Sequence, residues 1–169
     1  MHQMILVNPE KCTGCGVCEL ICSSTKEKVF NPRLSRIRVT RMEPFVDVAL
    51  TCRFCEIPLC VSSCPMDALR QDEKSGTVGL WYNLQLYRIP PPNHCIGCGS
   101  CVEHCKFGAM RLKRKRHPVP ISCDLCGGET PCVKFCPTGA LELTTLEMIA
   151  QKHREVTAKE FLKSLAAEI

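Results

Sequence analysis

The chain reads CTGCGVCELIC over residues 12–22 and CIGCGSCVEHC over residues 95–105. Both stretches have the cysteine spacing C-x2-C-x2-C-x3-C, and two related groups, at 52–64 and 123–136, have a longer middle spacer. All 16 cysteines of the 169 residues fall into these four groups. An internal repeat of this kind dominates the architecture, because each copy is expected to form the same local unit.

The spacing C-x2-C-x2-C-x3-C is typical of segments that hold [4Fe–4S] clusters in bacterial ferredoxins. Three thiolates on one tight loop can reach three irons of one cube, and the glycines beside them let the loop wrap closely. The last spacer starts a helix that turns the fourth cysteine toward a neighbouring cluster. We therefore predict four [4Fe–4S] clusters, with these ligands: Cys12, Cys15, Cys18, Cys22, Cys52, Cys55, Cys60, Cys64, Cys95, Cys98, Cys101, Cys105, Cys123, Cys126, Cys132 and Cys136.

Three other uses of the cysteines fit the sequence less well. Disulfides require an oxidising compartment, and the first residues lack the features of a secretory signal, so we expect a cytoplasmic protein with reduced thiols. Zinc sites usually use two cysteine pairs a dozen or more residues apart, whereas here a third cysteine follows each pair within six residues. A plant-type [2Fe–2S] site has the reverse spacing, C-x4-C-x2-C.

The composition agrees with a fold held together by metal. The hydrophobic fraction of 45% includes the cysteines, and aromatic residues make up only 5%. Cores this thin usually need covalent or metal crosslinks. The formal charge of +5 counts every cysteine as neutral, and sixteen thiolates with four oxidised 2+ cores bring it to about −3. The basic residues are therefore interpreted as partial compensation for the clusters and not as a nucleic-acid footprint.

Short strands and helices around the clusters predict the α+β class. Three of the groups lead into an alanine and then a strand pattern. We predict further strands at 34–39 and 46–50, and a hairpin whose turn is 72–76. The alanines are Ala68, Ala109 and Ala140.

Two further segments have open interpretations. Residues 82–94 include three consecutive prolines and are expected to form a surface loop, either a plain connector or a partner contact. Residues 111–117 are almost entirely basic, which predicts a solvated hairpin tip or a contact with an acidic partner.

The C-terminal residues 144–169 predict a helical tail. Thr144 with Glu147 and Thr157 with Glu160 have capping-box spacing, which favours two consecutive helices. The second has an apolar stripe that includes Phe161, Leu165 and Ile169. This stripe is expected either to cover the cluster domain or to dock on another subunit, including a second copy of the chain.

The four cysteine groups resemble those of the polyferredoxin electron-transfer subunits of multisubunit oxidoreductases. The resemblance includes the motifs CRFCEIPLC at 52–60 and CIGCG at 95–99. Such subunits serve tungsten or molybdenum enzymes such as aldehyde oxidoreductases and formate dehydrogenases, and also hydrogenases and CO dehydrogenase. The stretch NPRLSRI at 31–37 is most similar to the members associated with aldehyde oxidoreductases.

The spacing alone does not decide whether group one shares clusters with group two or with group four. The resemblance implies the nested arrangement, with two bicluster ferredoxin-like modules, an outer one at 1–45 plus 119–143 and an inner one at 46–118. It implies these ligand sets: Cys12, Cys15, Cys18 and Cys136; Cys22, Cys123, Cys126 and Cys132; Cys52, Cys55, Cys60 and Cys105; Cys64, Cys95, Cys98 and Cys101.

The resemblance implies an electron relay between a catalytic oxidoreductase subunit and a redox acceptor. No nucleotide-binding loop, catalytic triad or acid–base pair is evident in the sequence, so we expect a non-catalytic subunit. Two alternatives remain open, a free soluble carrier and a scaffold that polymerises through its tail helices. Nucleic-acid binding and direct membrane insertion are not expected.

Overall fold

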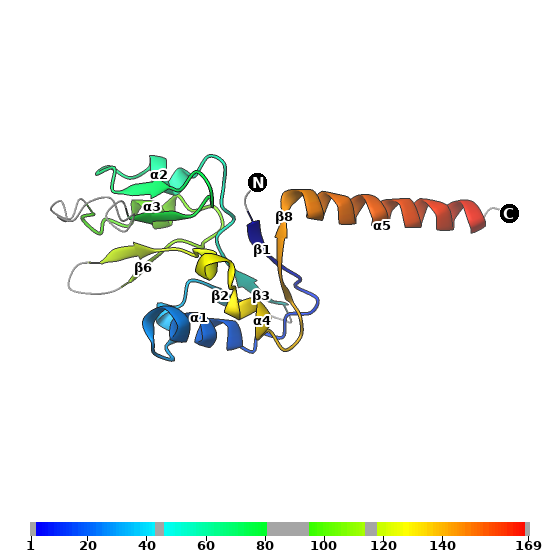
Figure 1. Cartoon of the computed structure of the whole chain (residues 1–169), viewed down its shortest axis with the longest axis horizontal. Coiled ribbons are helices and arrows are strands. Elements are labelled where there is room, and N and C mark those ends of the chain that lie inside the picture. Colours follow the sequence, from blue (N-terminus) through cyan, green and yellow to red (C-terminus); the bar gives the residue numbers. More distant parts are fainter. Residues whose placement is uncertain (1–2, 43–45, 81–94, 114–117, 168–169) are drawn as a thin grey trace.

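The computed structural model describes residues 3–42, 46–80, 95–113 and 118–167, with side chains except at 46 and 164–167. Its elements in chain order are β1 (Gln3–Val7), α1 (Val17–Glu27), η1 (Pro32–Leu34), β2 (Arg38–Met42), β3 (Val46–Leu50), α2 (Leu59–Ser62), β4 (Leu69–Gln71), β5 (Val78–Leu80), α3 (Ser100–Glu103), β6 (Arg111–Lys113), β7 (Val119–Ile121), η3 (Leu125–Gly128), α4 (Pro131–Lys134), β8 (Leu141–Thr145) and α5 (Leu146–Ala167). Short helices alternate with short strands (Figure 1), which confirms the α+β class.

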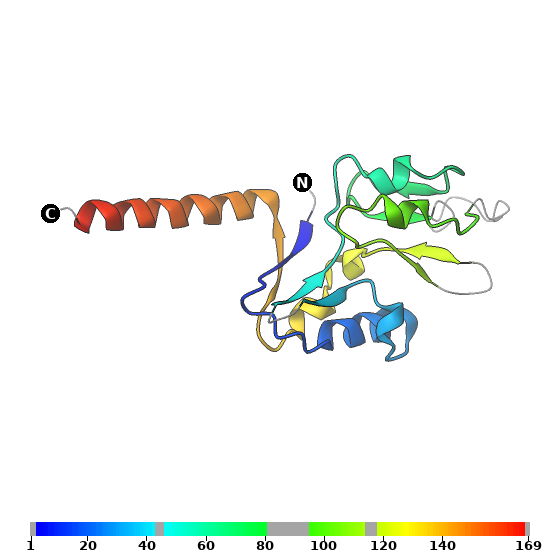
Figure 2. The ribbon, with the colours of Figure 1, turned by 180° about the vertical axis from the view of Figure 1, so that it is seen from behind.

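The described strands form four two-stranded antiparallel sheets. Three are local hairpins, β2–β3, β4–β5 and β6–β7, and the second has the predicted turn at 72–76. The fourth joins β1 to β8, with Gln3 opposite Thr145 and Val7 opposite Leu141. In the sequence, all the other elements of the cysteine-rich part therefore lie between two strands that pair with each other, and Figure 2 shows these two strands side by side.

The predicted helices follow the cysteine spacing. In every group the third cysteine lies in a helix, namely α1, α2, α3 or α4, because the last spacer begins a helical turn. The three alanines that follow the later groups are buried, at 3–5% exposure. Their small side chains let β4, β6 and β8 start directly against the cysteine loops, so this part of the prediction is confirmed.

The predicted strand at 34–39 is largely wrong. Residues 32–34 form the short helix η1, and β2 begins only at Arg38. The Asn31 side chain accepts a hydrogen bond from the Arg33 N–H at 3.0 Å, which caps a turn that Pro32 already favours. The alternating pattern that suggested a strand reflects two buried positions, Ser35 and Ile37, on an extended segment between the two elements.

Two hydrophobic clusters form the core, and both include cysteines. The first lies between β1, α1 and α4, and the second between β4, β5 and α3. The strand β3 pairs with β2, and the nearby Phe54 packs in the first cluster. The two parts are joined by Ser122, whose hydroxyl donates to the Val78 carbonyl, and by Arg111, whose guanidinium donates to the carbonyl oxygen of Ser35 at 3.0 Å.

The second residue after the first cysteine has a left-handed backbone in every group, with φ of +65° at Gly14, +50° at Phe54, +68° at Gly97 and +54° at Leu125. A Cβ at Gly97 would lie 3.0 Å from the Pro118 carbonyl oxygen, so this loop requires glycine. The two non-glycine residues bury their side chains, at 3% and 6% exposure. That burial offsets the cost of about 1–2 kcal/mol that a left-handed side-chain residue carries.

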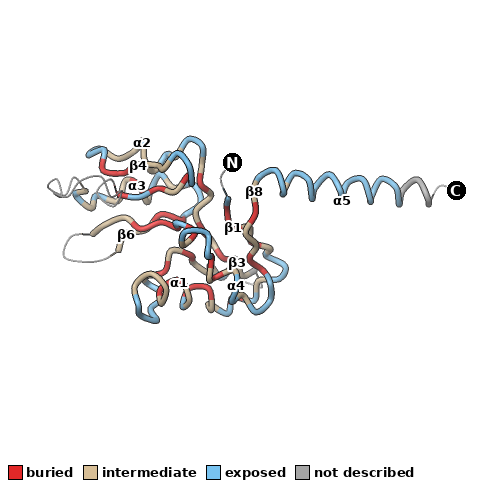
Figure 3. Tube along the Cα trace, in the orientation of Figure 1, coloured by how far each residue is buried: buried red, intermediate tan, exposed pale blue. Residues whose placement is uncertain are grey.

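The C-terminal tail is one helix, α5, and not the predicted two. Residues 146–167 contain neither glycine nor proline, so the helix passes through Thr157 without interruption. Thr144 is buried in β8, and Thr145 caps the helix instead, accepting a hydrogen bond from the Met148 N–H at 3.3 Å. Figures 1 and 3 show α5 projecting from the body, and its described side chains beyond Ala150 are all exposed.

Some predictions fall on residues that the structure does not describe. They include the loop at 82–94, the four basic residues at 114–117 and the side chains of Leu165, Ala166 and Ile169. Of the basic run, Arg111 and Lys113 are described, and both make contacts with the body. Among the described residues, no helix is both long and apolar enough to cross a membrane.

Candidate metal centre

All sixteen cysteines lie in the described part of the chain, and none forms a disulfide. Their arrangement decides which groups can share a metal cluster. No three His, Cys, Asp or Glu side chains among the described residues are arranged around one metal ion. Thiolates that bind separate iron corners of a cube need not meet at a single point, whereas zinc draws its sulfurs to about 2.3 Å from one atom.

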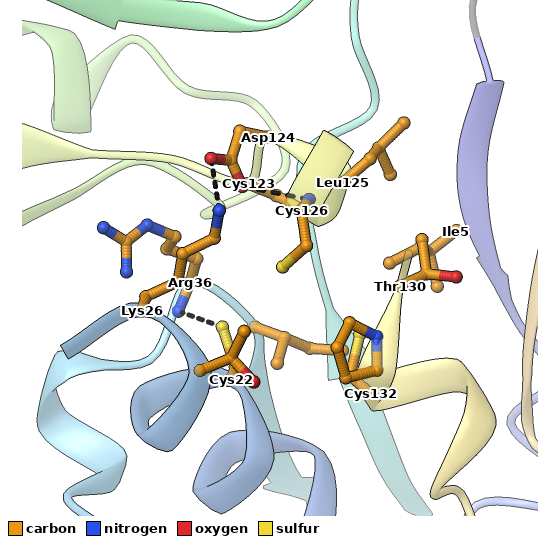
Figure 4. A pocket seen from close by; sticks show the side chains of 13 residues that line it. Ile5, Cys22, Lys26, Arg36, Cys123, Asp124, Leu125, Cys126, Thr130 and Cys132 are labelled. Carbon is orange, nitrogen blue, oxygen red and sulfur yellow. Dashed lines mark hydrogen bonds and ion pairs between the residues drawn. The ribbon is translucent and has the colours of Figure 1, made fainter. Parts of the chain in front are cut away.

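The clearest site is the α1–α4 cavity (Figure 4), which brings the last cysteine of group one to three cysteines of group four. Cys22 comes from α1, and the others come from the loop after β7 and from α4. Burial raises the pKa of the Cys132 thiol to about 12, and the neighbouring thiols, including Cys123 and Cys22, raise it further. The cysteines of this cavity are Cys22, Cys123, Cys126 and Cys132.

A second site, here called the α3 cavity, joins group two to group three. Cys64 lies there with Cys95, Cys98 and Cys101. Burial raises the pKa of the Cys101 thiol to about 11, and the thiols of Cys95 and Cys64 add to the effect. None of the residues that line the α3 cavity carries a charged side chain.

A third site, here called the α2 groove, joins the same two groups, but here group two supplies most of the cysteines and group three supplies its last one. Cys55, Cys60 and Cys105 line it. Burial raises the pKa of the Cys52 thiol to about 11, and the nearby thiols of Cys60, Cys55 and Cys105 raise it further. Cys52 therefore belongs to the same set. The groove is flanked by exposed Ile57 and by Phe107, whose ring lies 6.0 Å from the Arg53 guanidinium.

The remaining loop holds Cys12, Cys15 and Cys18. Burial raises the pKa of the Cys18 thiol to about 12, and Cys15 and Cys12 raise it further. Cys136 packs against the same hydrophobic core as Cys18.

The last cysteine of each group accepts hydrogen bonds from the backbone. The Ala68 N–H donates to Cys64 Sγ at 3.2 Å, and the Ala109 N–H donates to Cys105 Sγ at 3.3 Å. Burial alone would raise the pKa of the Cys136 thiol. The hydrogen bonds from the Leu141 and Ala140 N–H groups and from the Thr138 hydroxyl outweigh burial, so this pKa is lowered. Such donors stabilise the thiolate, which is the form that binds metal.

Group one obtains the same donor by a different route. Its helix α1 continues well beyond Cys22, so the turn that follows Cys64 and Cys105 is missing. The Arg36 N–H replaces it and donates to Cys22 Sγ at 3.2 Å. The stretch at 31–37 therefore has a structural role, because the η1 turn carries the Arg36 backbone back to the cysteine.

The polar groups around the α1–α4 cavity fit a negatively charged iron–sulfur cluster. Thr51 Oγ1 is buried without a hydrogen-bond partner of normal geometry and lies beside the Cys123 thiol. Lys26 adds a positive charge to the cavity lining, and the Arg36 N–H adds a hydrogen-bond donor to Cys22 Sγ. Of the three cysteine-lined sites, only the α2 groove has a histidine in its lining, namely His104.

Sequence reasoning missed several of these supporting residues. Thr51 and Lys26 are far in the sequence from Cys123 and Cys126, the cysteines beside which they lie. Arg36 acts through its backbone N–H, so no sequence motif marks it. A usable signal exists only for Phe54 and Leu125, since both occupy the position that is glycine in groups one and three.

Comparisons with known proteins match most of the cysteine-rich part. Two models described as 4Fe–4S dicluster domains match residues 51–109 and 94–141, and a 4Fe–4S binding domain matches residues 5–23. These matches and the sixteen cysteines support four [4Fe–4S] clusters. The two dicluster matches overlap at group three, so they do not decide which groups share clusters.

Among relatives, the chain is 40% identical over 132 residues to the polyferredoxin-like subunit of the aliphatic sulfonate oxidoreductase of Pyrococcus furiosus, covering 78% of this chain and 70% of that protein. It is 28% identical to the electron transport protein HydN of Escherichia coli K12, covering 95% and 100%. A solved structure, a BamBC complex of benzoyl-coenzyme A reductase, matches 98% of this chain and 95% of its own at 21% identity and a TM-score of 0.45. That TM-score is too low to support a conclusion of its own.

Proposed function

Because this chain belongs to the family of iron–sulfur electron-transfer subunits of oxidoreductases, we propose that it relays electrons through four [4Fe–4S] clusters bound in nested pairs. Groups one and four share two clusters, and groups two and three share the other two. The observation that carries this proposal is the α1–α4 cavity, where Cys22 lies with three cysteines of group four. The α3 cavity and the α2 groove support the inner pair in the same way. The outer site formed by Cys12, Cys15, Cys18 and Cys136 completes the assignment.

Each residue set contributes one part of the relay. The clusters supply one-electron redox chemistry when bound. The cysteines position them, the backbone N–H donors stabilise negative charge at the sulfurs, and burial excludes water. We propose that the chain forms the outer and inner bicluster modules of the nested arrangement. The boundary between them, expected at residues 45/46, is shifted to a position closer to Cys55. The pairing of β3 with β2 and the packing of Phe54 support this shift.

The partner is a catalytic oxidoreductase subunit, because the relative from Pyrococcus is a subunit of such a complex. We propose a tungsten or molybdenum enzyme of the aldehyde oxidoreductase type, supported by the resemblance of residues 31–37 to that group. Formate dehydrogenase, hydrogenase and CO dehydrogenase are the next partner types. A cytoplasmic location is proposed on the sixteen unpaired cysteines. Metal analysis of the native complex for tungsten, molybdenum and nickel distinguishes the partner types.

The relay requires a full set of clusters. Protein purified without oxygen is expected to contain about 16 iron and about 16 sulfide per chain, since each cube has four of each. Iron and acid-labile sulfide assays, with protein measured by amino-acid analysis, give the ratio. A value near 8 would contradict the four-cluster relay, and zinc in place of iron would contradict the cluster chemistry itself.

A second candidate function is a polymerising scaffold that conducts electrons through copies of this chain. The observation in its favour is α5, which projects from the body with exposed apolar side chains such as Leu146, Val156 and Leu162. Residues of α5 would then bind another subunit or another copy.

Removing residues 146–169 tests this scaffold and keeps every residue of β8, but it also removes the Lys152 ion pair with Glu142 and the packing of Ile149 on the core. If α5 mediates assembly, light scattering after size-exclusion chromatography is expected to fall from a large particle to a monomer of unchanged iron content. The single variant Val156→Glu should weaken the assembly, and the matched control Arg154→Gln, on the same helix, should not. A monomer before and after truncation would indicate a free carrier.

A further inference from the structure

The most enclosed of the proposed cluster sites has an unfavourable setting for an added electron. Cys22, Cys123 and Cys132 in the α1–α4 cavity are each only 8% exposed. An oxidised cluster with four thiolates has a net charge of about −2, and reduction makes it about −3. Burial disfavours the more highly charged form, so it lowers the reduction potential. A site this buried needs nearby positive charge if it is to accept electrons.

Lys26 supplies this charge. It is on α1, one helical turn beyond Cys22, and its side chain runs along the cavity wall. Its ammonium lies 2.5 Å from Asp124 Oδ2, in the cavity that Cys126 also lines. Figure 4 shows this ion pair at the end of the cavity nearest Cys126. Among the residues that line the cavity, Lys26, Arg36 and Asp124 carry charged side chains.

The carboxylate of Asp124 does not cancel the effect of Lys26. The Lys26 side chain is 19% exposed and that of Asp124 is 49% exposed, so solvent screens the carboxylate better than the ammonium. Three more charged groups lie near the cavity and together carry one net positive charge, because the two cations Arg36 and Lys113 share one carboxylate, Glu27. The Arg36 guanidinium points away from the sulfurs and pairs with Glu27 at 3.2 Å, and Lys113 also binds Glu27. Because the Arg36 guanidinium is directed away, Lys26 is the lining residue that places a cationic group beside the cysteines.

The α3 cavity gives a comparison within the same chain. It also encloses four cysteines, but no charged side chain lines it. Its cluster would depend on backbone donors such as the Ala68 N–H alone. The two sites therefore differ in charge and not in ligand type.

On these observations we infer that Lys26 raises the reduction potential of the cluster in the α1–α4 cavity and that Asp124 positions its ammonium. The inference rests on the proposed function, since it requires a cluster at this site. Reduction adds negative charge beside Cys126, and a cation there stabilises the reduced form more than the oxidised form. Lys26 thus raises the reduction potential of the most enclosed site enough for its cluster to accept electrons in the relay.

Redox titration of the anaerobic holo-protein, followed by electron paramagnetic resonance, tests this inference. Lys26→Gln is expected to lower the midpoint potential of one cluster, and Lys26→Glu to lower it further. Lys26→Arg should restore a potential close to that of the unaltered protein. Asp124→Asn should raise the potential, because it removes the opposing charge. The affected signal is identified as the one missing from the Cys22→Ala variant.

The matched control is Lys152→Gln on α5, which breaks an exposed ion pair with Glu142 of β8 and should leave every potential unchanged. Unchanged potentials in Lys26→Gln with full iron content would overturn the inference, and so would an equal shift in all clusters. If Lys26→Glu loses iron, the Gln, Arg and Asn variants still decide the sign. Failure of the proposed function has a separate signature, namely iron content below four clusters in the unaltered protein.

Discussion

Replacing Cys22 with alanine is expected to remove the cluster bound mainly by group four, and to leave the cluster bound by the rest of group one. Iron should fall from about 16 to about 12 per chain, because one cube has four irons. The physical reason is the α1–α4 cavity, where Cys22 lies with Cys123, Cys126 and Cys132. Iron analysis gives the count, and electron paramagnetic resonance of the reduced protein shows which signal is lost.

Cys136→Ala is the reciprocal variant. It should remove the cluster of Cys12, Cys15 and Cys18 and retain the one that depends on Cys22. If instead each variant destroys the cluster of its own group, the nested assignment is wrong and each group binds its own cube. Loss of a group-two signal in Cys22→Ala would support the pairing of group one with group two that the spacing alone leaves open.

Removing the clusters is expected to abolish cooperative unfolding. In the proposed nested pairing each cube joins two distant segments of the chain, as Cys22 and Cys123 illustrate, and so would act as a crosslink. A crosslink that closes a loop of about 100 residues stabilises a protein by on the order of 4 kcal/mol, if disulfides are a guide. Four crosslinks exceed the typical net stability of about 5–15 kcal/mol. The apolar core is too small to compensate.

The measurement is thermal unfolding by far-ultraviolet circular dichroism before and after anaerobic treatment with an iron chelator. Excess reductant must be present, so that disulfides do not replace the clusters. The treated protein should lose its sigmoidal transition and show reduced helix content. A transition of unchanged midpoint would show that the carbon core alone stabilises the fold.

The features that follow from local geometry could be predicted from the sequence. Cysteine spacing predicted the ligand loops and the helix at the third cysteine of each group, because both depend on a few consecutive residues. The buried alanines and the hairpin at 69–80 followed for the same reason. The tail was harder, because Thr157 has the residue type of a cap but no helix break before it.

Features that depend on contacts between distant segments could not be predicted. Nothing local connects the Arg36 N–H to Cys22, and the link exists because η1 redirects the chain. The alignment of the groups marks the position of Phe54 and Leu125, which is glycine in groups one and three, but it does not show the burial in the core that offsets their left-handed backbone. In the sequence, Lys26 has no feature that distinguishes it from an ordinary surface lysine on a helix. Its relation to Cys126 depends on how α1 packs against α4.

The pairing of β1 with β8 has a consequence for biosynthesis. β1 leaves the ribosome before the other described elements, yet its partner strand ends at Thr145. In the proposed nested pairing the inner cysteine groups are complete once Cys105 has emerged, so the inner sites could receive iron while translation continues. Domains form as their segments appear during synthesis, but the outer sites must wait for Cys123 to Cys136. The protein would therefore be filled from its middle outward, with the group-one cysteines exposed to oxidants for longest.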